Sequence, residues 1–183
     1  MHSAFVVEGD KMVLELLQSS LQIEAIYALE SWVQKHSVPL QSMTQIVYPI
    51  NSKALKSISN LSTPNEVLAV VKIPNESTTT TPKQLAFVLD NIQNPGNLGT
   101  IVRTADWLGM THLFCSPTCV DAYSPKVVQA SMGSLFRLQI VYGDLPTLFQ
   151  RFTTLPVYGA LLKGNDLFST TFGEQGFILI GNE

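Results

Sequence analysis

The sequence is poor in charged residues and in cysteine, and both shortages limit what the protein can be. Of its 183 residues, 14% are charged and 45% are hydrophobic, so the chain can bury a substantial core. Cys115 and Cys119 have only His112 nearby in the sequence, which falls short of the ligand set of a structural zinc site. We expect two reduced, structural thiols, no metal site and a cytoplasmic location.

Long apolar runs and a basic surplus are also missing. No apolar run approaches the about 18–20 residues of a membrane span. Met1-His2-Ser3 begins no basic signal segment, so neither membrane insertion nor secretion is expected. The net charge of −3 argues against binding to bulk polyanions, yet a local basic patch could still bind RNA.

A threonine-rich segment divides the chain. PNESTTTTP, at residues 74–82, offers no apolar face to bury and is expected to be exposed and extended. Strand and helix patterns alternate on both sides of it, which indicates an α/β class. We expect a small domain at residues 1–74, a linker at 75–83 and a second domain at 84–183.

The alternation predicts individual elements. A first apolar run spans residues 5–9, and further strands are expected at 23–29, 45–48, 67–73, 85–90, 111–115, 136–141, 156–162 and 176–181. Asp10, Ser52 and Asp144 are candidate caps of helices, because short polar side chains accept from the free amides of a first turn. Further helices are expected at 30–36, 99–108 and 125–130.

The stretch from Leu85 to Leu108, LAFVLDNIQNPGNLGTIVRTADWL, contains the densest chemistry. An apolar strand pattern leads through Asn94-Pro95-Gly96-Asn97, a turn sequence, into helical spacing of apolar residues. A glycine-containing loop lets the backbone approach a ligand closely, and the amides of a helix N-terminus favour anions. The stretch therefore predicts an anion-friendly strand, loop and helix, with Arg103 on the helix.

The same stretch resembles the first motif of the SpoU–TrmH (SPOUT) family of RNA ribose 2′-O-methyltransferases. The matching pattern is Asn91-x-x-Asn94-Pro95-Gly96-Asn97-x-Gly99-x-x-x-Arg103-x-Ala105. LIGNE, at residues 179–183, resembles the second motif, and ASMGS, at 130–134, resembles a Ser-x-Gly segment of the family. FVVEG, VLELL and VLAVV resemble the ribosomal-protein-like substrate-binding domain that is often fused to these enzymes.

The resemblance implies a fold, and it also shows that one motif of the family is missing from these residues. It implies a small amino-terminal α/β RNA-binding domain and a SPOUT-type α/β domain with a parallel sheet. The third motif of the family, a proline loop followed by Ser-Leu-Asn-Val-Ser, does not occur in these residues. In the family that segment completes a trefoil knot and lines the cofactor pocket. We therefore expect a C-terminally truncated domain with an incomplete knot, and no measurable cofactor binding by these residues alone.

The resemblance also assigns residues to a methyl-transfer site. It implies that Asn97, Arg103 and Glu183 are catalytic and that Leu161 and Gly181 contact S-adenosylmethionine. Simpler structural roles compete with three of these: Asn97 could cap its helix, Arg103 could pair with Asp106, and Leu161 could pack in the core. A guanidinium stays protonated, so Arg103 is expected to bind phosphate and stabilise the developing alkoxide, whereas the family proposal makes it the proton acceptor.

Partners follow from the same comparison. Ribosomal or transfer RNA is the implied substrate, and a homodimer is the implied assembly. Lys11, Lys53 and Lys56 are the candidate RNA-binding residues, the last two on one helix face, although acids outnumber lysines in this part of the chain. A non-catalytic RNA-binding or regulatory relative is the alternative function. A dinucleotide-binding enzyme is disfavoured, because the glycines do not form G-x-G-x-x-G.

Overall fold

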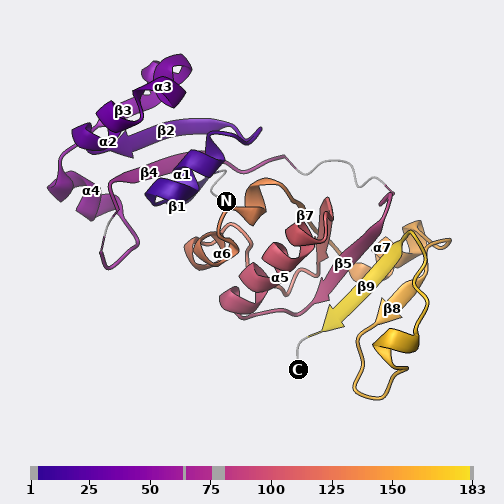
Figure 1. The fold of residues 1–183 in the computed structure, drawn as a ribbon. Helices are drawn as coiled ribbons and strands as arrows, with labels where there is room; N and C mark the ends of the chain where they lie inside the picture. The colour runs from indigo at the N-terminus through magenta and orange to yellow at the C-terminus, as the bar shows by residue number, and fades with distance from the viewer. Residues whose placement is uncertain (1–3, 64, 76–80, 182–183) are drawn as a thin grey trace.

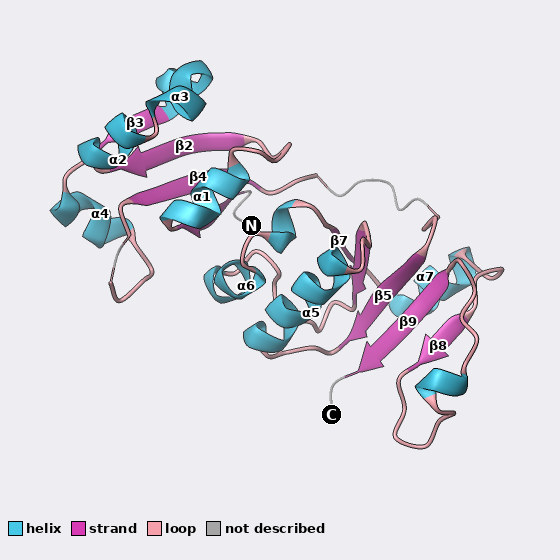
Figure 2. Ribbon diagram, in the orientation of Figure 1, coloured by secondary structure: helices cyan, strands magenta, loops and turns pink. Residues whose placement is uncertain are grey.

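The computed structural model describes residues 4–63, 65–75 and 81–181, and it contains two β-sheets with helices packed on them (Figures 1 and 2). The first sheet and its helices form an amino-terminal unit, and the second sheet and its helices form a carboxy-terminal unit. The two lie side by side. No helix in the described ranges is both long enough and apolar enough to cross a membrane.

The amino-terminal sheet has the strand order β1-β4-β2-β3. Strand β4 pairs antiparallel with both β1 and β2, and β3 pairs parallel with β2. The buried Trp32 anchors a helix to this sheet and donates its indole N–H to Asp10 Oδ1 at 2.7 Å. The elements are β1 (Ala4–Glu8), α1 (Asp10–Leu16), β2 (Ile23–Ala28), α2 (Glu30–Lys35), α3 (Ser37–Leu40), η1 (Gln41–Ile46), β3 (Val47–Pro49), α4 (Ser52–Ile58) and β4 (Val67–Lys72).

The carboxy-terminal sheet has five strands in the order β7-β6-β5-β9-β8, and every pairing is parallel. The expected α/β architecture with a parallel sheet is therefore confirmed, while the state of the knot stays a prediction. The elements are β5 (Leu85–Asp90), α5 (Pro95–Trp107), β6 (His112–Cys115), α6 (Pro125–Ser131), η2 (Ser134–Phe136), β7 (Gln139–Tyr142), α7 (Leu145–Arg151), β8 (Val157–Gly159), η3 (Leu167–Ser169) and β9 (Gly176–Gly181).

Helices cover both faces of the parallel sheet. Phe87 and Leu89 of β5 pack into the apolar cluster beneath α5 and α6, whereas Ala86 and Val88 face the cluster beneath α7. This is the period-two alternation of a strand buried on both faces. Phe177 of β9 lies on the α7 side with Phe114, and their rings meet edge to face.

The apolar core continues from one unit into the other. Helix α6 packs against strand β1, and the cluster that contains Val7 and Ile26 also contains Leu98 and Val128. The rings of Phe5 and Tyr123 lie with their centroids 5.0 Å apart across this contact. The predicted domain limits stay predictions, and residues 76–80 of the predicted linker lie outside the described residues.

Most predicted elements form, but several of their ends differ. Asp144 caps α7 as expected, whereas Asn51 rather than Ser52 caps α4. Asp10 does not cap α1: it is the first residue of the helix, and its carboxylate accepts from Trp32 instead. Strand β7 begins only at Gln139, because residues 134–136 form a 3-10 turn.

Gly99 sets the distance between α5 and α6. A Cβ atom at this position would lie 2.4 Å from Ala130 Cβ and 2.9 Å from Ala130 C, well inside contact distance. The motif glycine at this position therefore serves close packing between the two helices. Because Ala130 C belongs to the backbone, the neighbour cannot move away cheaply.

We expect Gly99→Ala to lower the free energy of unfolding by about 1–2 kcal/mol, because overpacking outweighs the gain in helix propensity. Gly143→Ala is the matched control, since Gly143 has open space around it and no positive φ angle. Urea unfolding followed by circular dichroism measures both. Equal stability of the two variants would contradict the close-packing role of Gly99.

Candidate methyltransfer site

The candidate site forms where the parallel strands end. Asp90, the last residue of β5, lies in register with Gly181, the last residue of β9. Gly159 at the end of β8 pairs with Leu179, and the Ala160 N–H donates to the Leu179 carbonyl at 2.9 Å. The carboxyl ends of three adjacent strands, β5, β9 and β8, therefore lie at one edge of the sheet, which is where open α/β sheets bind ligands.

The loop after β5 is fixed by side chains from the loop after β6. Asn91 adopts a positive φ of 56°, and its N–H donates to Ser116 Oγ at 2.9 Å. The Ile92 N–H donates to Cys119 Sγ at 3.3 Å, and the Val120 N–H donates to the Ile92 carbonyl at 2.9 Å. The residues before the motif helix are thus held rigidly, as a positioned site requires.

The two cysteines belong to this support. Both are free and buried, in keeping with the structural role expected for them. A hydrogen bond from the Cys115 thiol, with further ones from Ser116 and the Ile92 amide, lowers the pKa of Cys119 to about 6. Donation to Cys119, together with burial, raises the pKa of Cys115. The Cys119 Sγ also donates to the Leu89 carbonyl at 3.4 Å, so this thiol ties the loop after β6 to the end of β5.

Asn94 begins the motif helix. Its Oδ1 accepts from the Gly96 N–H at 2.8 Å and from the Asn97 N–H at 3.2 Å, and Pro95 occupies the first helical position. The alternative of Asn97 as the helix cap is therefore wrong. Because Asn94 satisfies these amides, the exposed side chain of Asn97 is left available for other partners.

One face of α5 is exposed along its length. Asn97, Thr100, Arg103 and Thr104 lie on this face and are all exposed, while Leu98 and Val102 are buried beneath the helix. The hydroxyls of Thr100 and Thr104 donate to the helix carbonyls one turn earlier. The exposed face therefore presents an amide and a guanidinium as its principal free hydrogen-bonding side chains.

Arg103 has no acidic partner within the described residues. The proposed pair with Asp106 is wrong, because Asp106 accepts two hydrogen bonds from Arg137 Nε, at 2.9 and 3.0 Å, and one from Arg137 Nη2, at 2.6 Å. The Arg137 guanidinium holds the pKa of Asp106 below its usual range. A permanent positive charge therefore stands unneutralised on the exposed face of α5.

The residues expected at the cofactor lie at the same sheet edge. Leu161 is 75% exposed and Leu162 is 99% exposed, so the alternative role in core packing is wrong. The expected strand stops at Gly159, before these leucines. Gly181 ends β9 with open space around it. Glu183 lies outside the described residues.

Ser131 and Gly133 have structural roles. The Ser131 hydroxyl donates to the Val128 carbonyl at 2.8 Å in the last turn of α6. Gly133 has a φ of +91° and lies against the carboxylate of Glu15. The segment that resembles the Ser-x-Gly motif therefore ends helix α6 and contacts the amino-terminal unit.

The candidate RNA-binding lysines separate into two places. Lys53 and Lys56 of α4 line one cavity together with Leu55, Asn65 and Glu66. Lys11 is exposed on α1 and does not line that cavity. The structure brings together the two lysines that share a helix face, with one carboxylate beside them.

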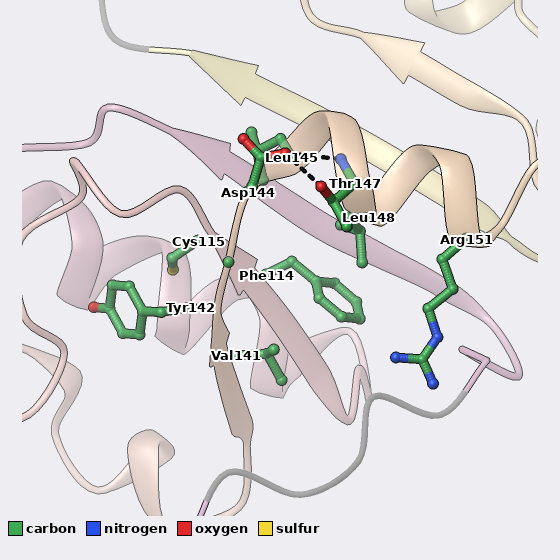
Figure 3. Close-up of a pocket in the computed structure, with 10 residues that line it drawn as sticks. Phe114, Cys115, Val141, Tyr142, Asp144, Leu145, Thr147, Leu148 and Arg151 are labelled. Atoms are coloured by element: carbon green, nitrogen blue, oxygen red, sulfur yellow. Dashed lines mark hydrogen bonds between the residues drawn. The ribbon is translucent and has the colours of Figure 1, made fainter.

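A small cavity of about 140 Å³ lies beside α7, next to strands β6 and β7 (Figure 3). It lies between the ends of β6 and β7 and the start of α7, with Phe114, Tyr142 and Leu148 among its lining residues. Arg151 extends from α7 at its margin. Strand β5 lies between the strands that line this cavity and β9, which carries Gly181, so the cavity is distinct from the candidate site.

Fold and site together define an α/β methylase unit with an appended substrate-binding unit. The chain belongs to the SpoU rRNA methylase family, which matches residues 84–183. The MRM3-like substrate binding domain matches residues 1–69.

Curated relatives cover the chain to different extents. The 23S rRNA (guanosine(2553)-2′-O)-methyltransferase RlmP of Bacillus subtilis is 29% identical over 99% of this chain and 72% of its own length. The mitochondrial rRNA methyltransferase 3 of Xenopus laevis is 30% identical over 76% of this chain, which covers 35% of that protein. The chain thus spans about a third of the mitochondrial relative.

Solved structures share the whole arrangement. A TrmH-family protein from Porphyromonas gingivalis superposes with a TM-score of 0.86 at 35% identity, over 98% of this chain and 72% of that one. The SpoU methyltransferase AviRb from Streptomyces viridochromogenes, solved with AdoMet, gives 0.81 at 26% identity, over 99% of this chain and 74% of that one.

We expect Asn94→Ala to lower the free energy of unfolding by about 1 kcal/mol, because two amides at the start of α5 lose their acceptor. Asn94→Ser keeps a capping oxygen and is expected to lose only a few tenths of that amount. Thermal unfolding by differential scanning fluorimetry compares the two variants. A serine variant as unstable as the alanine variant would contradict the capping role.

Proposed function

We propose that this protein transfers a methyl group from S-adenosylmethionine to a ribose 2′-hydroxyl of ribosomal RNA. The observation that carries the proposal is the exposed, unneutralised Arg103 on a helix that starts beside the ends of β5 and β9. The activities named for RlmP and for the mitochondrial relative favour ribosomal RNA over transfer RNA.

The sheet edge fits the proposed cofactor. Exposed Leu161 and Leu162 offer apolar surface to a purine ring, and Gly181 leaves backbone groups open to hydrogen bonding. Bound there, S-adenosylmethionine supplies an electrophilic methyl group. These residues hold and orient it, while Glu183, which belongs to the same motif, is proposed to help organise the site.

Arg103 and Asn97 form the substrate side of the proposed site. The guanidinium pairs with a backbone phosphate and stabilises negative charge as the 2′-hydroxyl loses its proton. Its permanent charge favours this electrostatic role over proton acceptance. Asn97, whose amide is not needed as a helix cap, orients the ribose by hydrogen bonding. Orientation of this kind can contribute about 7–11 kcal/mol to a bimolecular reaction.

The amino-terminal unit is proposed to hold the RNA. The match to a substrate binding domain supports this role, and Lys53 and Lys56 beside the α4 cavity are the proposed phosphate contacts, with Lys11 as a separate one. RNA recognition by shape and backbone needs only such local patches. The acidic balance of the chain favours one alternative, a relative that binds RNA without turnover.

Assembly and location complete the proposal. Trp107, which is 92% exposed, and Leu108 leave an apolar patch at the end of α5, and such a patch supports a homodimer contact. A cytoplasmic location is supported by the bacterial relative RlmP.

We expect Arg103→Ala to lower methyl transfer to ribosomal RNA at least about 100-fold, because phosphate pairing and alkoxide stabilisation are both lost. Transfer of labelled methyl from S-adenosylmethionine to isolated ribosomal RNA, by a form of the protein that contains the third motif of the family, measures the effect. The melting temperature is expected to stay unchanged, because the side chain is exposed and makes no ion pair among the described residues.

Arg151→Ala is the control, since Arg151 is an exposed arginine on α7, across the sheet from α5. Full activity of Arg103→Ala would overturn the role of Arg103. RNA binding by the wild-type protein without any methyl transfer would favour the non-catalytic alternative, and preferential labelling of transfer RNA would correct the substrate.

A further inference from the structure

Arg137 links three elements from both units. Its guanidinium donates from Nε and Nη2 to Asp106 on α5, and from Nη1 to Glu15 Oε1 on α1. Arg137 itself follows η2 in the carboxy-terminal unit. Within the described ranges, the Arg137–Glu15 contact is the only ion pair that joins the two units. We call Glu15, Asp106 and Arg137 the latch.

The contact surface is shaped for Glu15. A Cβ atom at position 133 would lie 2.3 Å from Glu15 Oε2, so Gly133 provides the space that this carboxylate occupies. The positive φ of Gly133, +91°, excludes most other residues as well. Beside the latch, β1 packs against α6 and Phe5 packs against Tyr123, so apolar contact accompanies the ion pairs.

The latch is better suited to orientation than to stability. The Arg137 side chain is 46% exposed and that of Glu15 is 38% exposed, and exposed pairs contribute little to stability. The contact with Asp106 uses two nitrogens of a rigid planar group, so it fixes direction as well as distance. Once Asp106 has fixed the guanidinium, the remaining Nη1 points to Glu15.

The latch ends on the helix that carries Arg103. Asp106 follows Arg103 by three residues, about one turn of α5. We propose that Arg137 is a positioning residue, which sets the orientation of the amino-terminal unit against α5 so that bound RNA is presented to Arg103. This inference rests on the proposed function, and it assigns to Arg137 and Glu15 a part in substrate presentation.

Glu15→Gln tests the latch, because it weakens the contact between the units and leaves the Asp106–Arg137 pair intact. We expect a larger radius of gyration by small-angle X-ray scattering at low salt. With ribosomal RNA, we expect kcat/KM to fall about tenfold, mainly through a higher KM for RNA, because presentation of the substrate is lost. The KM for S-adenosylmethionine is expected to stay unchanged, which a general loss of structure would not allow.

Glu24→Gln is the matched control, since Glu24 is an exposed glutamate of the same unit and the substitution removes the same charge. Arg137→Lys keeps the positive charge but loses the planar, two-nitrogen contact with Asp106. Its kcat/KM for ribosomal RNA is expected to lie between those of the wild type and Glu15→Gln. Unchanged scattering in an active Glu15→Gln variant overturns the latch alone, and changed scattering with an unchanged KM for RNA overturns the positioning role. If the wild-type protein with the third motif present transfers no methyl, the proposed function is overturned, and the positioning role with it.

Discussion

The parallel pairing of β5 with β9 is the constraint on which the site depends. These strands are far apart in the sequence, yet their register sets Asp90 beside Gly181. Because β8 and β6 are also parallel, the loop bearing Leu161 and the loop bearing Ser116 and Cys119 leave from the same edge. A slip of one residue would turn every side chain of β9 to the other face and remove Phe177 from the core.

The residues between β5 and α5 hold the start of the helix in place, while one face of α5 stays exposed to solvent. Ser116 and Cys119 accept from the amides of Asn91 and Ile92, and Asn94 accepts from the first amides of the helix. Gly99 then brings α5 close to α6 on the buried side. The polar and glycine residues of this stretch are thus mostly engaged in holding the helix, and Arg103 lies on the opposite, exposed face.

Local pattern predicted much of the fold, and long-range contact decided the rest. The expected strands around 85–90 and 176–181 and the Asp144 cap depend on apolar periodicity and capping chemistry, which neighbouring residues reveal. The partner of Asp106 could not be found in this way, because Arg137 is 31 residues away and outcompetes the helix neighbour. The strand expected at 156–162 was wrong at its end for a related reason. The composition around Leu161 and Leu162 suggests a buried strand, but no element in the described ranges covers these side chains.

The pairing of Asp106 with Arg137 also bears on how Arg103 can act. At three residues from Arg103, Asp106 would be the natural helix partner of that guanidinium, and such a pair would cancel much of its attraction for phosphate. Arg137 occupies the carboxylate through two nitrogens and lowers its pKa, so the carboxylate stays charged and engaged. The same interaction that is proposed to orient the two units therefore leaves the charge of Arg103 unpaired, and under the proposed function this couples substrate presentation to the electrostatics of the site.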